Sequence, residues 1–337
     1  MSNPIHPSKI LVTGGAGFIG SAVCRYFVAK GYRICNVDKL TYAANLKGLE
    51  AVKNEKNYEF EQADICDLAA MRRVFKNFQP DAILHLAAES HVDRSIKDSS
   101  NFIQTNLVGT ANLLGVATEC WRESDCKNTF RFHHVSTDEV YGDLLMDGSK
   151  FHEETPYNPS SPYSASKAGS DFLVSAWHRT YGLPVIISNC SNNFGPFQHP
   201  EKLIPMIIKN ALACQALPVY GTGQNVRDWL HVDDHVRALE IVLTKGVVGG
   251  KYNVGGDCER DNLTLVNQIC SFLDDKIPRR SGQPYNQLIT FVPDRPGHDL
   301  RYAVDTTKML NEFNWQPAHS FETGLEQTVD WYLANEF

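Results

Sequence analysis

The sequence predicts an α/β protein in which a doubly wound parallel sheet is joined to a smaller C-terminal α/β domain. Short aliphatic or β-branched runs alternate with longer amphipathic segments over the first 190 residues. This alternation is typical of right-handed crossovers in a parallel sheet that is covered on both faces. After residue 190 the alternation stops, and proline and glycine become frequent, as in GPFQHPEKLIP and VPDRPGHD. A chain of 337 residues also exceeds what one hydrophobic core usually organises.

The first part of the chain is predicted to contain six strands and four helices. The strand candidates are short apolar runs at 9–14, 32–38, 58–64, 82–88, 129–137 and 183–189. The helix candidates are the amphipathic segments between them, near 18–30, 68–78, 98–121 and 162–181. Ligands of such sheets bind at the carboxyl ends of the strands, so motifs at these ends are candidates for a binding site.

The domain boundaries are predicted from where the alternation stops and resumes. Residues 1–190 and about 233–257 form the larger domain, because DDHVRALEIVLTK and KYNVG again have the patterns of a helix and a strand. Residues from about 191 to 232 and from 258 to 337 form the smaller domain, which is expected to bind the substrate.

Composition and charge exclude several classes of function. Lys and Arg number 32 against 39 acidic residues, and this net charge of −7 gives no long-range attraction for nucleic acid or anionic lipid. No apolar run approaches the ~20 residues of a membrane span, and MSNPIHPSKI lacks the apolar stretch of a signal peptide. The nine cysteines form no CxxC pair, which predicts reduced thiols, no zinc site and a cytoplasmic location.

A glycine-rich stretch, TGGAGFIG, ends the first strand candidate and opens the first helix candidate. Gly14, Gly17 and Gly20 allow a tight turn and a close backbone approach, so a pyrophosphate can lie on the helix N-terminus. Asp38 ends the next strand, where a carboxylate accepts hydrogen bonds from an adenosine ribose and repels a 2′-phosphate. The pattern predicts a Rossmann-type site for NAD, and Lys39 beside Asp38 weakens the preference over NADP.

Two further motifs bear groups that can move protons. SPYSASKAG sets Tyr163 four residues before Lys167, on one face of a helix candidate. A neighbouring ammonium favours the phenolate, which can then remove a hydroxyl proton, although Y-x-x-x-K is also common as a surface pair. VSTDEVYG places Asp138 and Glu139 at the end of a strand candidate, and taken alone this octapeptide predicts a solvated turn.

Together these motifs resemble those of the dTDP-glucose 4,6-dehydratases, within the extended short-chain dehydrogenase/reductase superfamily. The resemblance runs nearly end to end, through TGGAGFIG, VDKLTYAANL, LHLAAESHVDRSI, VSTDEVYG, PYSASKAGSD, NCSNNFGPFQHPEKLIP, VYGTGQNVRDWLHVDDH and DRPGHDLRYA. Thr137, Asp138 and Glu139 are its most discriminating part. Related 4-epimerases carry Ser-Ser-Ala from position 136, whereas UDP-glucuronate decarboxylases and GDP-mannose dehydratases keep the Glu but have Ser in place of Asp138.

The resemblance implies a reaction in which C4 of the sugar is oxidised, water is lost across C5 and C6, and C6 is reduced. Tyr163, with Lys167 beside it, would remove the C4 hydroxyl proton, and Thr137 would bond the C4 oxygen. Glu139 would remove the C5 hydrogen, while protonated Asp138 would donate a proton to the departing C6 hydroxyl. An anionic Glu139 and the apolar strand are expected to raise the pKa of Asp138.

The resemblance also implies two sets of binding residues. The NAD set contains Tyr163 and Lys167 together with residues at the strand ends: Gly14, Gly17, Phe18, Ile19, Gly20, Asp38, Lys39, Leu40, Thr41, Asp64, Ile65, Leu86, Ala87 and Ala88. The nucleotide-sugar set contains Ser90, Asn193, Lys202, Leu203, Pro218, Tyr220, Arg227, Asn262, Arg295 and His298. Arg227 and Arg295 offer the planar fork that suits a diphosphate.

Several polar or aromatic residues either have two possible roles or are not expected to belong to the site. Asn106 belongs either to the site or to the core. Phe194 stands where NNYGP would have Tyr, which puts part of the sugar side in doubt. His231 and His235 have the spacing of a zinc helix, but no third ligand is apparent, so HVDDH is predicted to be a helix N-terminus with capping acids and no metal is expected. His133 and His134 are expected to be structural, with no carboxylate nearby.

Several alternatives stay open. The runner-up functions are the same dehydration on UDP-glucose, or a sugar-nucleotide 4-epimerase with unusual acids. A non-catalytic NAD-responsive regulator on the same fold is the third, although such proteins usually lack the Tyr–Lys pair. The resemblance further implies a homodimer joined through the two long helices near 98–121 and 162–181.

Overall fold

A seven-stranded sheet forms the frame of the larger part of the molecule, in a computed structural model that describes residues 4–124 and 127–335. The strand order is β10-β6-β5-β4-β1-β2-β3, and all neighbouring pairs are parallel. The direction of winding reverses between β1 and β4, where ligands of such sheets bind. The strands are β1 (Lys9–Thr13), β2 (Arg33–Asp38), β3 (Tyr58–Gln62), β4 (Ala82–His85), β5 (Arg131–Thr137), β6 (Val185–Cys190) and β10 (Lys251–Val254).

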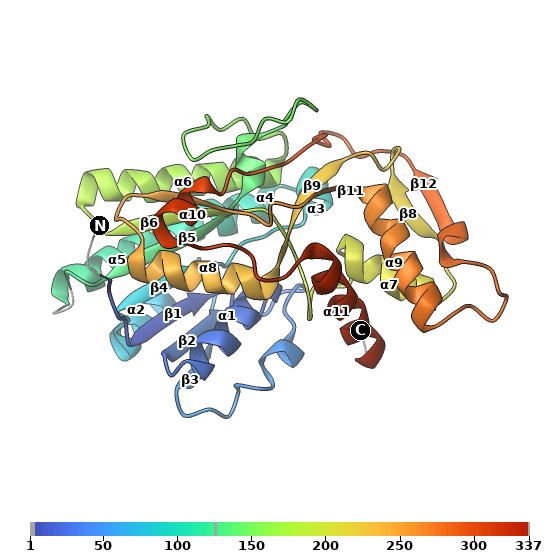
Figure 1. The fold of residues 1–337 in the computed structure, drawn as a ribbon. Helices are drawn as coiled ribbons and strands as arrows, with labels where there is room; N and C mark the ends of the chain where they lie inside the picture. The colour runs from blue at the N-terminus through green and yellow to red at the C-terminus, as the bar shows by residue number, and fades with distance from the viewer. Residues whose placement is uncertain (1–3, 125–126, 336–337) are drawn as a thin grey trace.

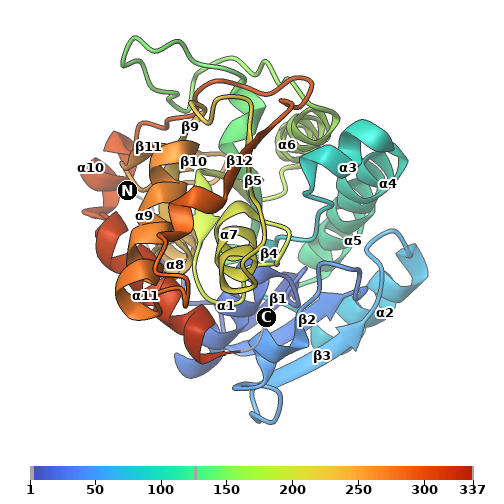
Figure 2. The same cartoon turned by 90° about the vertical axis from the view of Figure 1, so that its right-hand side faces the viewer.

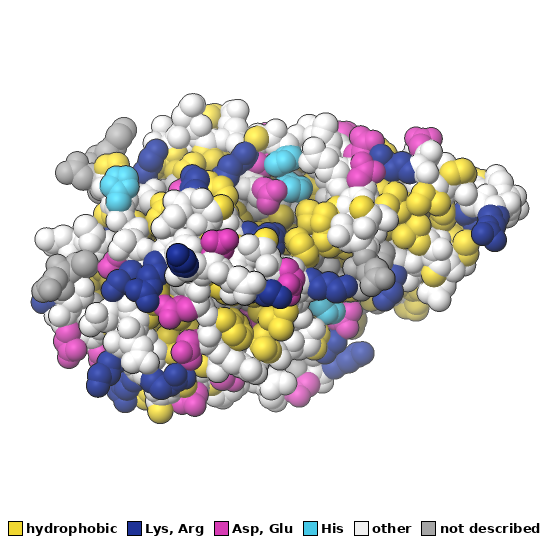
Figure 3. Space-filling model, turned by 90° about the horizontal axis from the view of Figure 1, so that it is seen from below, with side chains coloured by type: hydrophobic (Ala, Val, Ile, Leu, Met, Phe, Trp, Pro, Cys, Tyr) yellow, Lys and Arg dark blue, Asp and Glu magenta, His cyan; other side chains and the backbone are white. Residues whose placement is uncertain are grey.

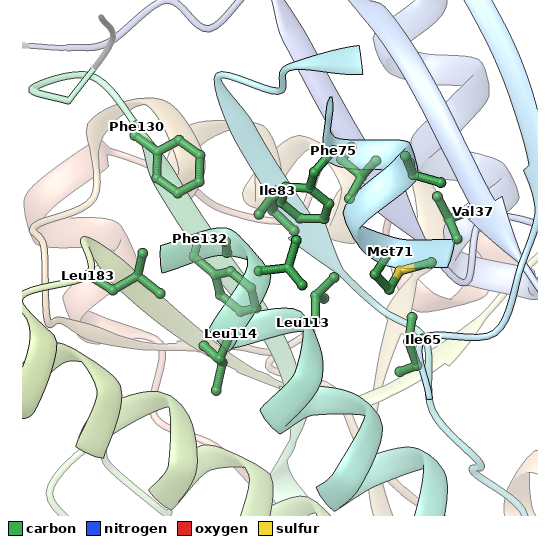
Figure 4. Close-up of a cluster of buried hydrophobic side chains, with 14 of the residues drawn as sticks. Val37, Ile65, Met71, Phe75, Ile83, Leu113, Leu114, Phe130, Phe132 and Leu183 are labelled. Carbon is green, nitrogen blue, oxygen red and sulfur yellow. The ribbon is translucent and has the colours of Figure 1, made fainter. Parts of the chain in front are cut away.

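Helices cover both faces of this sheet because successive strand residues point to opposite sides. In β1, Leu11 packs into the core cluster beneath α2, α5 and α6, whereas Ile10 and Val12 pack into the cluster beneath α1 and α8. Figure 4 shows part of the first cluster, with Phe75 beside Ile83. The helices are α1 (Phe18–Ala29), α2 (Leu68–Phe78), α5 (Thr110–Glu123), α6 (Pro162–Tyr181) and α8 (Val232–Lys245).

The smaller part of the molecule lies on the right of Figure 1 and faces the viewer in Figure 2. Its core joins α7, α9 and α11 to short strands, around Phe194, Trp229 and Phe321. One sheet has the order β11-β9-β7, and β12 pairs with β8. The elements are β7 (Asn192–Phe194), α7 (Leu203–Leu212), β8 (Leu217–Tyr220), β9 (Val226–His231), β11 (Glu259–Asp261), α9 (Asn262–Lys276), β12 (Ile289–Val292) and α11 (Phe321–Ala334), while α10 (Thr307–Phe313) packs against β10.

The predicted fold class is confirmed, with differences at the ends of the elements. The strand predicted at 82–88 ends at His85, and the helix predicted near 98–121 is continuous but changes form. It consists of α4 (Ser100–Phe102), a π-helical stretch at Ile103–Gly109, and α5. Such π-helical turns are frequent at functional sites, and this one carries Thr105 into the cleft described below. Short helices also occur at Leu46–Leu49, Val92–Lys97 (α3), Asp138–Tyr141 and Tyr285–Leu288.

The surface agrees with the charge balance of the sequence. On the face shown in Figure 3, basic and acidic side chains are interspersed. Among the described residues, none of the helices combines the length and the apolar character that crossing a bilayer requires.

Candidate active site

A cleft of about 320 Å³ lies over the carboxyl ends of the large sheet. All five predicted catalytic residues line it, as does every predicted NAD-binding residue except Leu40. Leu40 packs its side chain beside the α1 cluster instead. Three of the predicted sugar-nucleotide residues also line the cleft, namely Ser90, Asn193 and Lys202. The other seven lie outside its lining: Leu203, Pro218, Tyr220, Arg227, Asn262, Arg295 and His298.

The glycine turn between β1 and α1 has a different requirement at each glycine. Gly14 has φ +74°, a left-handed backbone that favours glycine. A Cβ at Gly20 would lie 2.1 Å from the carbonyl oxygen of Gly14, so close packing of the helix on the turn excludes a side chain. A Cβ at Gly17 would meet only that same oxygen, at 3.3 Å. The protein itself therefore requires Gly17 least, which fits a position kept open for a bound pyrophosphate.

Asp38 is held at the end of β2 by two backbone amides. Its Oδ2 accepts from the N–H of Ala16 at 2.9 Å, and its Oδ1 accepts from the N–H of Leu40 at 2.8 Å. Burial raises the pKa of Asp38, and these two hydrogen bonds lower it in part. The carboxylate is thus fixed where an adenosine ribose would meet it in a dinucleotide site.

Lys39 interacts with other acids near the same end of the cleft. Its Nζ lies 3.7 Å from Asp64 Oδ2 and 3.9 Å from Glu89 Oε1, and it donates to Thr105 Oγ1 at 3.1 Å. An ammonium engaged in this way offers less to a 2′-phosphate than a free one does. The structure therefore strengthens the preference for NAD that Lys39 had weakened in the sequence.

Asp138 is buried and lacks part of its hydrogen bonding. The residue is 1% exposed, and its Oδ2 has no hydrogen-bond partner among the described residues. Burial is the largest effect that raises the pKa of Asp138 well above its usual value, and the charges of Glu139 and Asp228 add to it. The site therefore favours the protonated form of Asp138, and because the side chain is buried the solvated-turn interpretation is wrong.

Glu139 occupies a different environment although it is the next residue. It is partly exposed, and its backbone N–H donates to Thr137 Oγ1 at 3.3 Å. Burial raises its pKa, but the charges of three cations oppose this shift, namely Arg295, Arg227 and Lys202. Neighbouring carboxyl groups whose surroundings differ in this way can serve as an acid and a base.

Tyr163 and Lys167 are presented by the first turns of α6. Ser161 and Ser164 form a capping box at its N-terminus, and Pro162 occupies the first turn. Both the tyrosine and the lysine are buried at the cleft.

The pKa of Tyr163 depends on more than the charge of Lys167. Burial and the charge of Glu139 raise the pKa of Tyr163 well above its usual value, while a hydrogen bond with Thr137 lowers it. Lys167 Nζ donates to the carbonyl oxygen of Val135 at 3.0 Å. Desolvation of the phenolate thus outweighs the other effects on this phenol, and the role of Lys167 in favouring the phenolate stays a prediction.

The two arginines predicted to bind a diphosphate are placed differently. Arg227 is buried, donates to the carbonyl oxygens of Val226 at 2.7 Å and Asp299 at 3.0 Å, and lies 4.3 Å from the centre of the Tyr302 ring. Arg295 is more accessible, with its Nη1 3.9 Å from Asp93 Oδ1. Arg227 thus acts on Asp138 and Glu139 mainly through its charge, whereas Arg295 has a guanidinium that a ligand can reach.

The remaining predicted residues of this end come from the smaller part of the molecule. Tyr220 donates to Asp93 Oδ2 at 3.5 Å and makes an edge contact with the ring of His298. Pro218 lies in β8, and Asn262 begins α9. Leu203 begins α7 and packs partly into the core.

Two of the doubtful positions, Asn106 and Phe194, have clear contacts in the structure. Asn106 is a core residue, because its amide exchanges hydrogen bonds with the backbone of Glu89 at 2.9 and 3.0 Å. Phe194 packs against Trp229 and Phe321 away from the cleft, so the missing hydroxyl does not affect the sugar side.

The expectation that His134 has no carboxylate nearby is wrong. Its Nε2 lies 3.1 Å from Asp171 Oδ1, because the fold brings α6 against β5. His133 has the structural role that was expected, with its Nε2 2.9 Å from Ser188 Oγ.

HVDDH begins a helix, as predicted. His231 is the N-cap of α8, and both acids lie in the first turn. The fold also brings His319 to this point, so that one ligand atom each from His231, Asp233 and His319 lie within 4.8 Å of one another. No spacing in the sequence connects His319 with HVDDH, and the absence of a metal stays a prediction.

A contact network at the cleft was missed by sequence reasoning. The guanidinium of Arg94 lies 3.6 Å from the centre of the Tyr42 ring and donates to Glu201 at 2.8 Å. His91 Nε2 lies 3.3 Å from the same glutamate. These residues come from three separate loops or short helices, and no spacing in the sequence connects them.

Comparisons with known proteins agree with this geometry. The family model described as GDP-mannose 4,6-dehydratase matches residues 11–328. A curated dTDP-glucose 4,6-dehydratase of Haemophilus influenzae is 57% identical over 97% of this chain and 98% of its own. The crystal structure of a dTDP-glucose 4,6-dehydratase from Bacillus anthracis in complex with NAD is 44% identical, with a TM-score of 0.85 over 97% of each chain. A UDP-glucose 4-epimerase from Thermus thermophilus, also solved with NAD, is 27% identical, with a TM-score of 0.84 over 96% of this chain and 99% of its own.

Proposed function

The chain belongs to the family whose model is described as GDP-mannose 4,6-dehydratase, and from its 57% identity to a dTDP-glucose 4,6-dehydratase we propose that it converts dTDP-glucose to dTDP-4-keto-6-deoxyglucose and water. The observation that carries the proposal is the adjacent pair of Asp138, whose burial favours the protonated form, and Glu139, which is partly exposed and whose charged form is favoured by three cations. Loss of water across a carbon–carbon bond needs one acid and one base, and this pair supplies both.

NAD is the cofactor, and the residues of the cleft fit it. Gly17 is left open on its side-chain face, Asp38 is fixed at the end of β2, and Lys39 is engaged by acids. When bound, NAD takes up a hydride from C4 of the sugar and returns it to C6.

Tyr163, Glu139 and Asp138 would move the protons of this reaction. Tyr163 would take the proton of the C4 hydroxyl as the phenolate, the form that the charge of Lys167 favours and that burial opposes. A ketone at C4 acidifies the C5 hydrogen, which Glu139 then removes. Asp138 donates its proton to the departing C6 hydroxyl, since its buried site favours the neutral acid before transfer.

The nucleoside diphosphate would bind toward the smaller part of the molecule. Lys202 lines the cleft, and its charge, with that of Arg295, acts on Glu139. We assign the diphosphate to these two cations and to Asn193. We assign the base and ribose of the substrate nucleotide to a set of residues from the smaller part of the molecule, namely Leu203, Pro218, Tyr220, Asn262 and His298. Arg227 is buried and would contribute its positive charge.

We also propose how the chain divides into domains, that it forms a homodimer, and that it is cytoplasmic. Residues 1–190 and about 233–257 would form the NAD-binding domain, because β10 pairs with β6 and α8 packs against α1. A homodimer through the long helices is supported by exposed apolar side chains there, with Ile103 50% and Phe172 62% exposed. A cytoplasmic location is supported by the cysteines, because all eight described ones are free.

The alternatives have less support. An epimerase would share the Tyr–Lys pair, but the epimerase structure is 27% identical to this chain, against 57% for the dehydratase relative. A non-catalytic regulator has no need of a neutral acid beside a base in an NAD cleft.

The test is to incubate the purified protein with dTDP-glucose and, in parallel, with UDP-glucose, and to measure the 4-keto product by mass spectrometry. We expect turnover of dTDP-glucose without stoichiometric added NAD, because the cofactor is regenerated in each cycle. Faster turnover of UDP-glucose, a C4 epimer as product, or reduced cofactor that accumulates in step with product would contradict the proposal.

A further inference from the structure

A buried polar network lies behind the cleft, on the face of α6 that carries Tyr163 and Lys167. Asp171 follows Lys167 by four residues, one helical turn farther along this face. It is 1% exposed and does not line the cleft. Asp171 therefore acts on the site only through other protein groups.

Asp171 is anchored through its Oδ2, while its Oδ1 faces His134 without a hydrogen-bond partner among the described residues. Oδ2 accepts hydrogen bonds from Ser136 Oγ at 2.9 Å, Tyr157 OH at 2.8 Å and Asn189 Nδ2 at 3.3 Å. Oδ1 lies 3.1 Å from His134 Nε2. Burial raises the pKa of Asp171, but the contacts with His134, the charge of Lys167 and the bond from Ser136 bring it below its usual value. This carboxylate is therefore ionised despite its burial.

The ring of His134 brings this carboxylate and Lys167 close together. Its Nε2 lies 3.4 Å from Lys167 Nζ and 3.1 Å from Asp171 Oδ1, so the ammonium and the carboxylate lie within charge–charge range of each other across one ring nitrogen. Burial lowers the pKa of Lys167, and the charge of Asp171 is the largest effect that opposes this. Without that charge, a buried lysine tends to lose its proton.

Few other groups near Lys167 can supply a compensating charge. The titratable groups around it are His85 on β4, His134 on β5, Cys190 on β6, and Tyr163 and Asp171 on its own helix. Burial lowers the pKa of His134 to about 4 and that of His85 well below its usual value, so both are neutral at pH 7. Burial likewise raises the pKa of Cys190 to about 12 and that of Tyr163 well above its usual value, so the site disfavours an anion at either residue. In this group only Asp171 is an anion.

We propose that Asp171 is a positioning residue whose charge, across the ring of His134, keeps the Lys167 ammonium charged and holds it against the cleft. The inference rests on the proposed function, in which Lys167 assists Tyr163 at C4. A neutral lysine would remove the one cation of the Tyr–Lys pair, and the C4 step would slow.

Asp171→Asn tests this, because the amide keeps the shape and loses the charge. The holoenzyme is assayed with dTDP-glucose across pH, and kcat and KM are separated. We expect the basic limb of the kcat profile to move to lower pH by about one unit or more, equal to a tenfold or greater loss above the limb. KM should change less than about twofold, because Asp171 does not touch the substrate.

Two variants control the experiment. Tyr157→Phe removes a hydrogen bond to the same carboxylate oxygen and leaves the charge, so the basic limb should stay in place. His134→Asn removes the ring between the two groups and keeps the charge of Asp171, so the limb should stay closer to its wild-type position than in Asp171→Asn. If Asp171→Asn does not fold, Asp171→Ser, which also removes the charge, decides the question by the same criterion.

A wild-type limb in Asp171→Asn, or a loss of kcat that is equal at every pH, would show that the residue has only a structural role. If the wild type made no product from dTDP-glucose, the proposed function would fail separately. Nitrogen NMR of the Lys167 ammonium would then still decide the inference, which predicts titration at lower pH in the variant and is overturned by an unchanged titration.

Discussion

Thr137 Oγ1 donates a hydrogen bond to Asp138 Oδ1 at 3.2 Å, while Oδ2 of the same carboxyl group has no partner among the described residues. One oxygen is thus oriented by the strand end, and the other is free to carry a proton. Because both residues line the cleft, this relationship orients the acid toward a bound sugar.

Asp138→Asn should slow the loss of the C6 hydroxyl, because the amide is a far weaker acid. We expect kcat to fall by about 10²-fold, within the usual contribution of a general acid. Incorporation of solvent deuterium at C5 should persist, since Glu139 is intact. Mass spectrometry of recovered substrate measures this, and an enzyme that neither exchanges C5 nor eliminates would contradict the separation of roles.

Glu139→Gln should block the reaction one step earlier. The amide cannot remove the C5 hydrogen, whereas Tyr163 and Lys167 remain to oxidise C4. Reduced cofactor should therefore build up on the enzyme, with absorbance at ~340 nm, a property of nicotinamide. Deuterium should enter C5 far more slowly than in the wild type. Normal turnover of both this variant and Asp138→Asn would refute the dehydratase assignment.

Wild-type activity should fall as pH rises through the raised pKa of Asp138, because only its protonated form can act as the acid. The sign follows from the site, since burial and Glu139 both disfavour the charged form. A kcat profile over pH measures this limb; the residual activity of Asp138→Asn should lack it and retain only the basic limb of Lys167.

Tyr163→Phe should leave the fold intact and lower turnover by roughly 10²-fold or more, because the C4 hydroxyl loses its base. Stopped-flow absorbance should show that reduced cofactor no longer forms during the first turnover. Tyr181→Phe, on the same helix and 45% exposed, is the matched control and should behave as the wild type does.

Gly17→Ala and Gly20→Ala should separate cofactor binding from stability. A Cβ at position 17 clashes little with the protein, so the variant should fold and bind NAD more weakly. At position 20 the added carbon would lie 2.1 Å from the Gly14 oxygen, and the melting temperature should fall. Calorimetric titration with NAD and thermal melts distinguish the two, and equal NAD affinity in Gly17→Ala and wild type would refute the placement of the pyrophosphate.

Arg295→Ala should mainly raise KM for dTDP-glucose, because it removes a contact made equally in the ground and transition states. Arg227→Ala is a different change, since it leaves the carbonyl oxygens of Val226 and Asp299 without their donor and should also lower stability. Arg260→Ala removes a surface ion pair with Glu322 and is the control. A large loss of kcat at unchanged KM in Arg295→Ala would contradict its role in binding.

The sequence by itself determined the alternation of strands and helices, the NAD turn, and the Thr137–Glu139 and Tyr163–Lys167 motifs. These features are local, because hydrophobic period and residue spacing are properties of short segments. The parallel sheet then follows, since consecutive strands joined by helices must cross over in one hand. The carboxyl ends of those strands meet at one edge, which is where the motifs came together.

Only the tertiary structure decided which charges surround these groups. Burial of Tyr163 disfavours its phenolate, and carbonyl oxygens occupy the guanidinium of Arg227, because desolvation and hydrogen-bond partners depend on residues far apart in the chain. The contact of His134 with Asp171 joins residues that are 37 positions apart in the chain, and it exists only because α6 packs on β5. Spacing in a sequence carries no record of such approaches, so the charge on Lys167 and the acidity of Asp138 were decided by the fold.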